Sequence, residues 1–173
     1  MLWNGLARNL RRGPATLQAG PVDTATTQAL ADRLAAASQA RLGRSLAIRH
    51  IDSGSCNACE LELQMLNSIV YDLERFGLRF VASPRHADVL LVTGPVSRNM
   101  QDALLRTWNA TPDPKWVVAI GDCAIDGGVF KGSHAVMGGV ESVLQVDLLI
   151  QGCPATPTQM LEGLRALVEA NAR

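Results

Sequence analysis

The sequence predicts an α/β protein built on an open, mostly parallel sheet with helices on both faces. Five short apolar runs alternate with helical patterns along residues 45–173. One of these runs, at residues 88–93, is apolar almost throughout, which is typical of a strand covered on both faces. The alternation implies right-handed crossovers between parallel strands. A chain of 173 residues is long enough to bury a core as one domain.

The first 44 residues are predicted to form an extension in front of the domain at residues 45–173. Residues 1–12 combine an apolar helical face with three arginines, which indicates either a short amphipathic basic helix or a solvated terminus. Residues 13–22 are rich in proline and glycine, as linkers are. The alanine-rich residues 24–41 predict a weakly anchored helix.

Strands and helices alternate within the domain. The predicted strands are residues 46–51, 78–82, 88–93, 116–120 and 146–150. The predicted helices are residues 60–76, 99–109 and 158–170. Gly77 marks the end of the first of these helices, and Gly94-Pro95 ends the third strand. The glycine-rich stretch that follows residue 123 and runs to Val140 shows no clear period.

The predicted helix at residues 60–76 carries a strong apolar stripe. Its apolar residues at helical spacing are Leu66, Ile69, Val70 and Leu73, and Leu61 and Met65 widen the stripe. We therefore expect this helix to be heavily buried.

The formal net charge is zero, but the charges are unevenly distributed. Residues 1–49 carry seven arginines and two acidic groups, so the rest of the chain is acidic. Phosphate binding needs a basic face, so nucleic acid is not an expected partner of the domain. We expect no transmembrane helix and no secretory leader, which favours metal binding over disulfides for the four cysteines.

The four cysteines follow predicted strands. Cys56 and Cys59 come after the first strand, Cys123 after the fourth and Cys153 after the fifth. Because the carboxyl ends of parallel strands meet at one edge, this topology should gather the thiols there. Small residues flank each cysteine, so that backbone amides can approach a bulky inorganic group.

Four thiolates suit zinc or an iron–sulfur cluster. One Cys-x-x-Cys knuckle with two lone cysteines on separate loops favours a 4Fe–4S cluster over the paired knuckles of zinc ribbons. Zinc, redox-active thiols and plain buried cysteines remain alternatives, and a flavin-binding fold is a weaker one.

Several motifs together resemble one family. They are Cys56-Asn57-Ala58-Cys59-Glu60, residues 83–88, Thr93-Gly94-Pro95-Val96, Gly121-Asp122-Cys123 and Gly152-Cys153-Pro154. In this order they are similar to the 20 kDa, or B, subunit of respiratory complex I and to the small subunits of membrane-bound nickel–iron hydrogenases. The resemblance covers residues 45 to about 168. It implies a flavodoxin-like fold and one 4Fe–4S cluster held by Cys56, Cys59, Cys123 and Cys153.

The spacing of Cys56 and Cys59 indicates the branch of the family. Complex I has two adjacent cysteines here, whereas the hydrogenase small subunits have a spaced pair. The chain has no cysteine for a second cluster, so it most resembles the compact small subunit of formate-hydrogenlyase or hydrogenase-4 type complexes. One departure is Ala155, where the family commonly has a second proline. We expect this change to alter the stiffness of the loop and not the ligation.

The resemblance implies an electron-relay subunit of an oxidoreductase complex that is not catalytic alone. Its expected partners are a large catalytic subunit, a ferredoxin-like iron–sulfur subunit and membrane-arm subunits, at the cytoplasmic face of the cell membrane. The alternatives are a complex I-like subunit that donates electrons to quinone and, in a different class, a zinc-stabilised scaffold.

Other polar residues near these motifs are weaker candidates. Glu60 has two possible roles. Its negative charge can stabilise the amino-terminal end of a helix, or it can couple proton transfer or a partner protein to the cluster. Asp122 and Asp126 are expected to form hydrogen bonds within their loop. Arg98 and Asn99 are candidates for a partner interface. His134 and Met137 are candidates too, but a structural role within their loop is at least as well supported for them. Arg85 and His86 precede the third strand, and His86 is expected at the surface.

Overall fold

The computed structural model describes residues 43–170 without a gap, except for the side chains at positions 75 and 76. Before residue 43 it describes residues 25, 28, 29, 32, 33, 36, 39 and 40, which are helical and exposed, as a weakly anchored helix would be. The predicted helix at residues 1–12 and the linker at residues 13–22 lie outside the described residues. None of the described helices has the length and apolar character that a membrane span needs.

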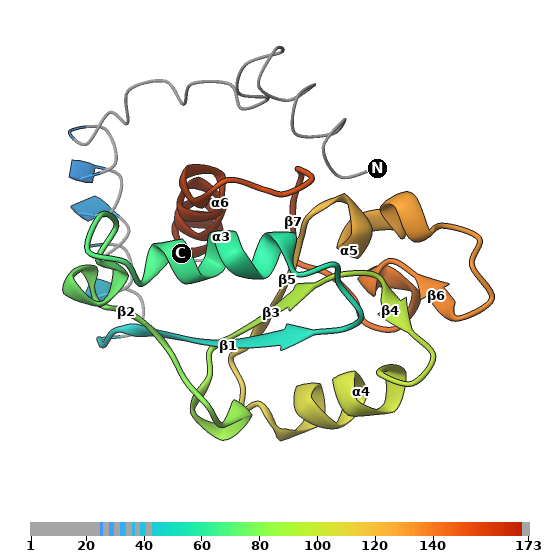
Figure 1. Ribbon diagram of the computed structural model, residues 1–173. Coiled ribbons are helices and arrows are strands. Elements are labelled where there is room, and N and C mark those ends of the chain that lie inside the picture. The colour runs from blue at the N-terminus through green and yellow to red at the C-terminus, as the bar shows by residue number, and fades with distance from the viewer. Residues whose placement is uncertain are drawn as a thin grey trace, which may run out of the picture.

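A five-stranded, fully parallel sheet forms the centre of the domain (Figure 1). Its strands are β1 (Leu46–Asp52), β2 (Leu78–Phe80), β3 (Val89–Thr93), β5 (Trp116–Ile120) and β7 (Leu148–Ile150). They are arranged in the order β2-β1-β3-β5-β7, which is the order of flavodoxin-like folds. The five predicted strands and the fold class are therefore confirmed, although the second and fifth strands are shorter than expected.

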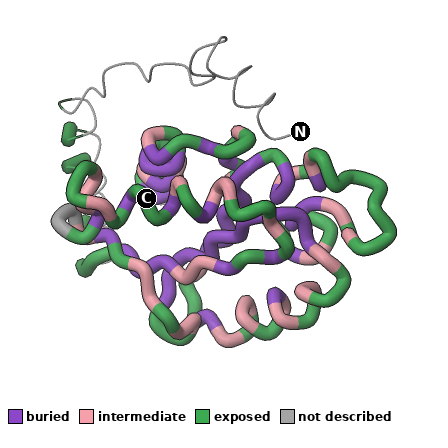
Figure 2. The backbone as a smooth tube through the Cα atoms, in the orientation of Figure 1, coloured by how far each residue is buried: buried purple, intermediate pink, exposed green. Residues whose placement is uncertain are grey.

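Helices cover both faces of the sheet, as predicted. Helices α3 (Ala58–Leu66) and α6 (Pro157–Ala170) pack on one face, and α4 (Gln101–Ala110) and the short α5 (Asp122–Asp126) pack on the other. Successive residues of β3 point to opposite faces, so Val89 and Leu91 join one core cluster and Leu90 and Val92 the other. Strands β3 and β5 are purple in Figure 2, because each of their residues is buried.

The predicted burial of the helix at residues 60–76 is wrong. Helix α3 ends at Leu66, and only a short 3₁₀ helix, Leu73–Phe76, follows it. Asn67 and Ser68 favour turns over helix interiors, and Asp72 adopts a left-handed conformation with φ 45°, so the helical period is broken. Ile69 is consequently 98% exposed. Val70, Leu61 and Met65 are also exposed, whereas Leu63, Leu66 and Leu73 face the core.

The glycine-rich segment contains more regular structure than the sequence indicated. A two-stranded antiparallel ribbon pairs β4 (Val96–Ser97) with β6 (Val136–Gly138). The remaining 3₁₀ helices are Pro84–His86, Gly128–Phe130 and Val140–Ser142. Gly139 packs so closely on α5 that a Cβ there would lie 2.0 Å from the carbonyl oxygen of Ile125.

Candidate metal centre at the carboxyl edge of the sheet

The topology brings the four cysteine-bearing segments to one edge of the sheet. Cys56 lies in the loop after β1, and Cys59 lies in the first turn of α3. Cys123 lies in α5 directly after β5, and Cys153 follows β7. Since β1, β5 and β7 run parallel, all of these segments leave the sheet at its carboxyl edge, as predicted.

Hydrogen bonds join the loop of Cys123 to the loop of Cys153. The N–H of Gly121 donates to the carbonyl oxygen of Ile150 at 2.8 Å, and the N–H of Asp122 donates to that of Gly152 at 3.0 Å. In return, the N–H of Gly152 donates to Oδ1 of Asp122 at 2.9 Å. Asp122 therefore has the hydrogen-bonding loop role that the sequence predicted, and it fixes two cysteine loops relative to each other.

Two glycines let the backbone lie directly against the thiols. A Cβ on Gly121 would lie 2.6 Å from Sγ of Cys59, and one on Gly128 would lie 2.8 Å from Sγ of Cys123. Both glycines have positive φ, 87° and 49° respectively. The sulfurs thus lie in cradles that a side chain at either glycine would fill.

The thiols interact electrostatically across the three loops. Burial raises the pKa of Cys59, and the backbone N–H of Ala155 opposes this shift. The nearby negative charges of Glu60, Cys123 and Cys56 raise the pKa of Cys59 further. Burial likewise raises the pKa of Cys123, against a hydrogen bond from the N–H of Val129, and negative charge on Cys153 and Cys56 raises it further. Cys56 and Cys153 are exposed.

In the described part of the chain, no three His, Cys, Asp or Glu side chains are grouped as the ligands of a single metal ion are. Each of the four thiols nevertheless lies within electrostatic reach of at least one other. Thiolate sulfurs are soft ligands, so four thiols at one edge of the sheet can hold a soft metal centre.

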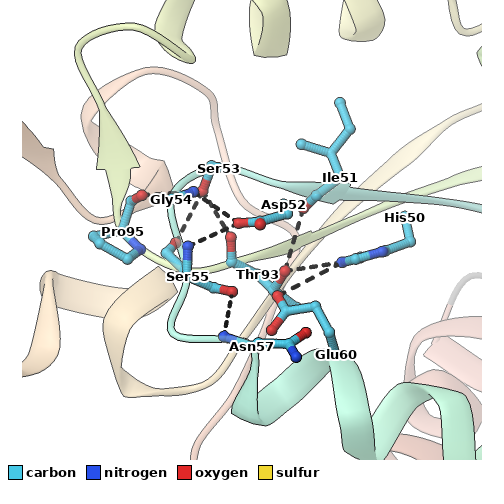
Figure 3. Close-up of polar contacts among 11 residues, drawn as sticks. His50, Ile51, Asp52, Ser53, Gly54, Ser55, Asn57, Glu60, Thr93 and Pro95 are labelled. Atoms are coloured by element: carbon cyan, nitrogen blue, oxygen red, sulfur yellow. Dashed lines mark hydrogen bonds and ion pairs between the residues drawn. The ribbon is translucent and has the colours of Figure 1, made fainter.

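Side chains of the first loop fix its path (Figure 3). Oδ1 of Asp52 accepts hydrogen bonds from the N–H groups of Gly54 and Ser55, at 2.8 and 2.7 Å. Oγ of Ser55 then accepts one from the N–H of Asn57 at 3.0 Å. These bonds turn the chain sharply between β1 and the first two cysteines. Neither Asp52 nor Ser55 was among the site residues predicted from the sequence.

Ser53 joins this loop to the end of β3. It is fully buried, and its hydroxyl lies 2.8 Å from the carbonyl oxygen of Thr93, 3.0 Å from that of Gly94 and 3.2 Å from that of Pro95. A hydroxyl has only one proton to donate, so Ser53 donates it best to the Thr93 carbonyl oxygen, which is the nearest of the three. Ser53 thereby holds the cysteine loop against the neighbouring β3 loop.

Replacement of Ser53 by alanine should lower the free energy of unfolding by about 1–3 kcal/mol, because buried carbonyl oxygens lose their donor. Urea unfolding of the full chain measures this change. Ser133→Ala removes a hydroxyl from an exposed turn and should change stability by less than about 0.5 kcal/mol. Equal effects of the two substitutions would contradict the role assigned to Ser53.

Glu60 lies in the first turn of α3, as the sequence predicted, and is 8% exposed. Neither carboxylate oxygen has a hydrogen-bond partner among the described residues. Nε2 of His50 is 3.9 Å away and lies closer, at 2.8 Å, to the hydroxyl of Thr93. Burial lowers the pKa of His50, and Glu60 opposes that shift. Both side chains line a cleft of about 430 Å³ beside β1 and α3.

The other candidates form loop contacts or lie exposed at the surface. Nε of Arg98 donates to the carbonyl oxygen of His134, which joins the ends of the β4–β6 ribbon. Asp126 pairs with Lys131 at 2.8 Å and accepts the N–H of Gly128, so its predicted loop role is confirmed. His86 is exposed beside the amino end of β3, as expected. Asn99, Met137 and Arg85 are also exposed.

Sheet order and site together define the class of protein. It is an α/β protein of flavodoxin-like topology that carries four cysteine thiols on the ligand-binding edge of its sheet. Residues 56–167 match the family described as NADH ubiquinone oxidoreductase, 20 kDa subunit. The chain belongs to this family, so the predicted family is confirmed.

The chain is also similar to individual curated proteins and to a solved structure. The chain is 40% identical to formate hydrogenlyase subunit 7 of Escherichia coli over 87% of its own length and 59% of that protein's. It is 42% identical to the probable membrane-bound hydrogenase subunit mbhJ of Pyrococcus furiosus, over 76% of this chain and 79% of that one.

Among solved structures, the chain resembles one from the membrane-bound sulfane sulfur reductase, an archaeal respiratory membrane complex. The TM-score is 0.67 at 31% identity, over 82% of this chain and 76% of that one. The matched relatives therefore include a formate hydrogenlyase subunit, the branch that the spacing of Cys56 and Cys59 indicated.

Proposed function

We propose that this chain is an electron-transfer subunit that holds one 4Fe–4S cluster through the thiolates of Cys56, Cys59, Cys123 and Cys153. The observation that carries the proposal is the arrival of four thiols from three separate loops at one sheet edge. Glycines lie directly against two of the sulfurs, which leaves room beside them for a bulky inorganic group. The donor set, four soft sulfurs, fits such a cluster.

When bound, the cluster supplies one-electron redox chemistry. The chain's own residues would hold the thiolates in place and shield the deeper pair, Cys59 and Cys123, from water. The described site offers no nucleophile paired with a general base, and we assign it no chemical step on an organic substrate.

We further propose that the chain works inside a membrane-associated complex of the hydrogenase type. The support is that two relatives are described as hydrogenlyase and membrane-bound hydrogenase subunits. In such a complex the chain, with a cluster held by its four thiolates, would pass electrons between a ferredoxin-like subunit and a large catalytic subunit. The chain would sit peripherally at the cytoplasmic face of the membrane, next to membrane-arm subunits.

Metal analysis of the anaerobically purified full chain tests the cluster. We expect about four irons and about four sulfides per chain, with broad visible absorption that bleaches on reduction. A colourless protein with one zinc per chain would instead support the zinc-stabilised scaffold and would refute the electron-relay function.

Loss of the Asp122 side chain should make the cluster easier to remove. Asp122→Ala deletes the acceptor for the Gly152 N–H, whereas Asp122→Asn keeps an oxygen at the same place. A hydrogen bond worth about 1 kcal/mol predicts iron loss to a chelator that is about 2–10-fold faster in the alanine variant than in the asparagine variant. Equal rates in the two variants would show that this bond does not hold the Cys153 loop.

A further inference from the structure

Glu60 holds a buried carboxylate that has no hydrogen-bond partner in the described part of the chain. The residue is 8% exposed, and both Oε1 and Oε2 are without a donor there. Nε2 of His50 lies 3.9 Å from Oε1, beyond hydrogen-bonding distance, and is closer, at 2.8 Å, to the hydroxyl of Thr93 (Figure 3). Burial of a charge without a partner costs free energy, so the stability of the isolated chain does not explain this carboxylate.

The carboxylate lines the cleft of about 430 Å³ between α3, β1 and the end of β2. Leu63 and Phe80 supply apolar walls, and the exposed residues Gln64 and Asn67 border the cleft on α3. Arg49 borders the cleft too, but it makes no hydrogen bond to the carboxylate. The cleft therefore presents a charged acceptor that the described residues leave unsatisfied.

An exposed apolar strip lies beside the cleft on α3. Leu61 and Met65 are 54% and 44% exposed, and each directly follows a residue that lines the cleft. They are four positions apart and thus share one side of the helix. Ile69, in the turn after α3, is 98% exposed. A continuous apolar strip next to a buried, unpaired charge is typical of a surface that another protein covers.

The charge of this surface indicates the chemistry of its occupant. From residue 58 to residue 74 the chain has no basic side chain and four acidic ones, Glu60, Glu62, Asp72 and Glu74. The complementary group is therefore a positively charged donor, a lysine ammonium or an arginine guanidinium. A small organic cation could satisfy the carboxylate but would leave Leu61 and Met65 uncovered, which favours a protein segment.

We propose that another subunit of the complex inserts a lysine or arginine side chain into this cleft and packs apolar side chains on Leu61 and Met65. This inference rests on the proposed function, because it takes the chain as one subunit of a larger complex. The ion pair with Glu60 would be shielded from water, and removal of one partner from such a pair is among the most costly changes at an interface. Because Glu60 directly follows Cys59, the partner would be anchored beside the cysteine edge of the sheet.

Photocrosslinking tests which protein covers the cleft. Gln64 is replaced by benzoyl-phenylalanine in the full-length tagged chain, and the complex is irradiated before isolation. We expect a crosslinked peptide from another subunit, with a lysine or arginine near the site of attachment. Asn109 is exposed in α4 on the opposite face of the sheet, and the same group there should not give that peptide. No crosslink at residue 64, or one only to this chain, would overturn the proposal.

Glu60→Gln tests the charge itself. The complex isolated through the tag should retain at least about tenfold less of the crosslinked subunit after a salt wash. Glu62→Gln makes the same change on α3 at a position that faces away from the cleft, and it should retain the wild-type amount. Wild-type retention in Glu60→Gln would overturn the proposal.

Urea unfolding of the full chain separates docking from a role within the fold. A neutral amide costs less to bury than an unpaired carboxylate, so Glu60→Gln should unfold at the wild-type urea concentration or above it. A lower midpoint would assign the carboxylate to its own helix and would overturn the proposal.

Iron content separates this inference from the proposed function. If Glu60→Gln loses iron as well as the subunit, Cys153→Ser shows whether iron loss alone releases the subunit: release there would overturn the proposal, and retention would support it. A wild-type chain without iron that still gives the crosslink would refute the electron relay and leave the docking site standing.

Discussion

Replacement of Cys153 by serine is expected to remove most of the bound iron while leaving the fold intact. Cys153 is exposed and lies in a loop, so the loss of its sulfur should change the free energy of unfolding by less than about 0.5 kcal/mol. A serine hydroxyl is a much poorer ligand for iron than a thiolate, because it does not ionise in the same pH range. The expected result is a folded chain with less than about a quarter of the wild-type iron and no signal of a reduced 4Fe–4S cluster.

The exposure of Cys153 makes this test specific. Cys123 is only 9% exposed, so Cys123→Ser combines a packing change with loss of a ligand, whereas Cys153→Ser does not. Gln151→Ser changes an exposed residue of the same loop and should keep its iron, which makes it the matched control. Iron and sulfide are measured after anaerobic purification, and urea unfolding confirms that each variant is folded. Full iron retention in Cys153→Ser would remove Cys153 from the ligand set.

The parts of the fold that the sequence predicted are those with strong local patterns. The runs that became β3 and β5 are buried along their whole length, so apolar character alone marks them as central strands. The place of the cysteines followed from a general rule, because any residue just past a parallel strand lies at the carboxyl edge. Neither inference needed knowledge of a contact between distant residues.

The features that the sequence did not predict depend on the local end of an element or on distant contacts. Ile69 and Val70 continue the apolar period of α3, but the chain leaves the helix before them. The β4–β6 ribbon pairs residues about 40 positions apart that carry no strand pattern of their own.

The polar residues around the first cysteine loop were missed for a related reason. Ser53 and His50 have roles only because β1 lies beside β3, which brings Thr93 within hydrogen-bonding distance of each. In each case the function depends on a partner from another element.

Replacement of Gly121 by alanine should abolish stable cluster binding, although the affected residue is not a ligand. The new Cβ would lie 2.6 Å from Sγ of Cys59, far inside the contact distance of carbon and sulfur. The sulfur is the end of a side chain, so the least costly relief is rotation of Cys59 away from Gly121. That rotation preserves the sheet but takes one thiolate out of its position at the edge. The variant should therefore fold and yet lose most of its iron.

Gly132 provides a control for an alanine placed at positive φ. It has φ 82°, but a Cβ there would meet no atom within 4 Å. Gly121, with φ 87° and ψ 154°, lies in a backbone region populated almost only by glycine, so an alanine there costs about 1–3 kcal/mol in backbone strain. Both variants should therefore lose stability in urea, Gly121→Ala at least as much as Gly132→Ala, and only Gly121→Ala should lose iron. If Gly132→Ala lost as much iron, backbone strain and not the Cys59 cradle would explain the effect. If Gly121→Ala kept its iron, the Cys59 sulfur would not need the position in which the structure places it.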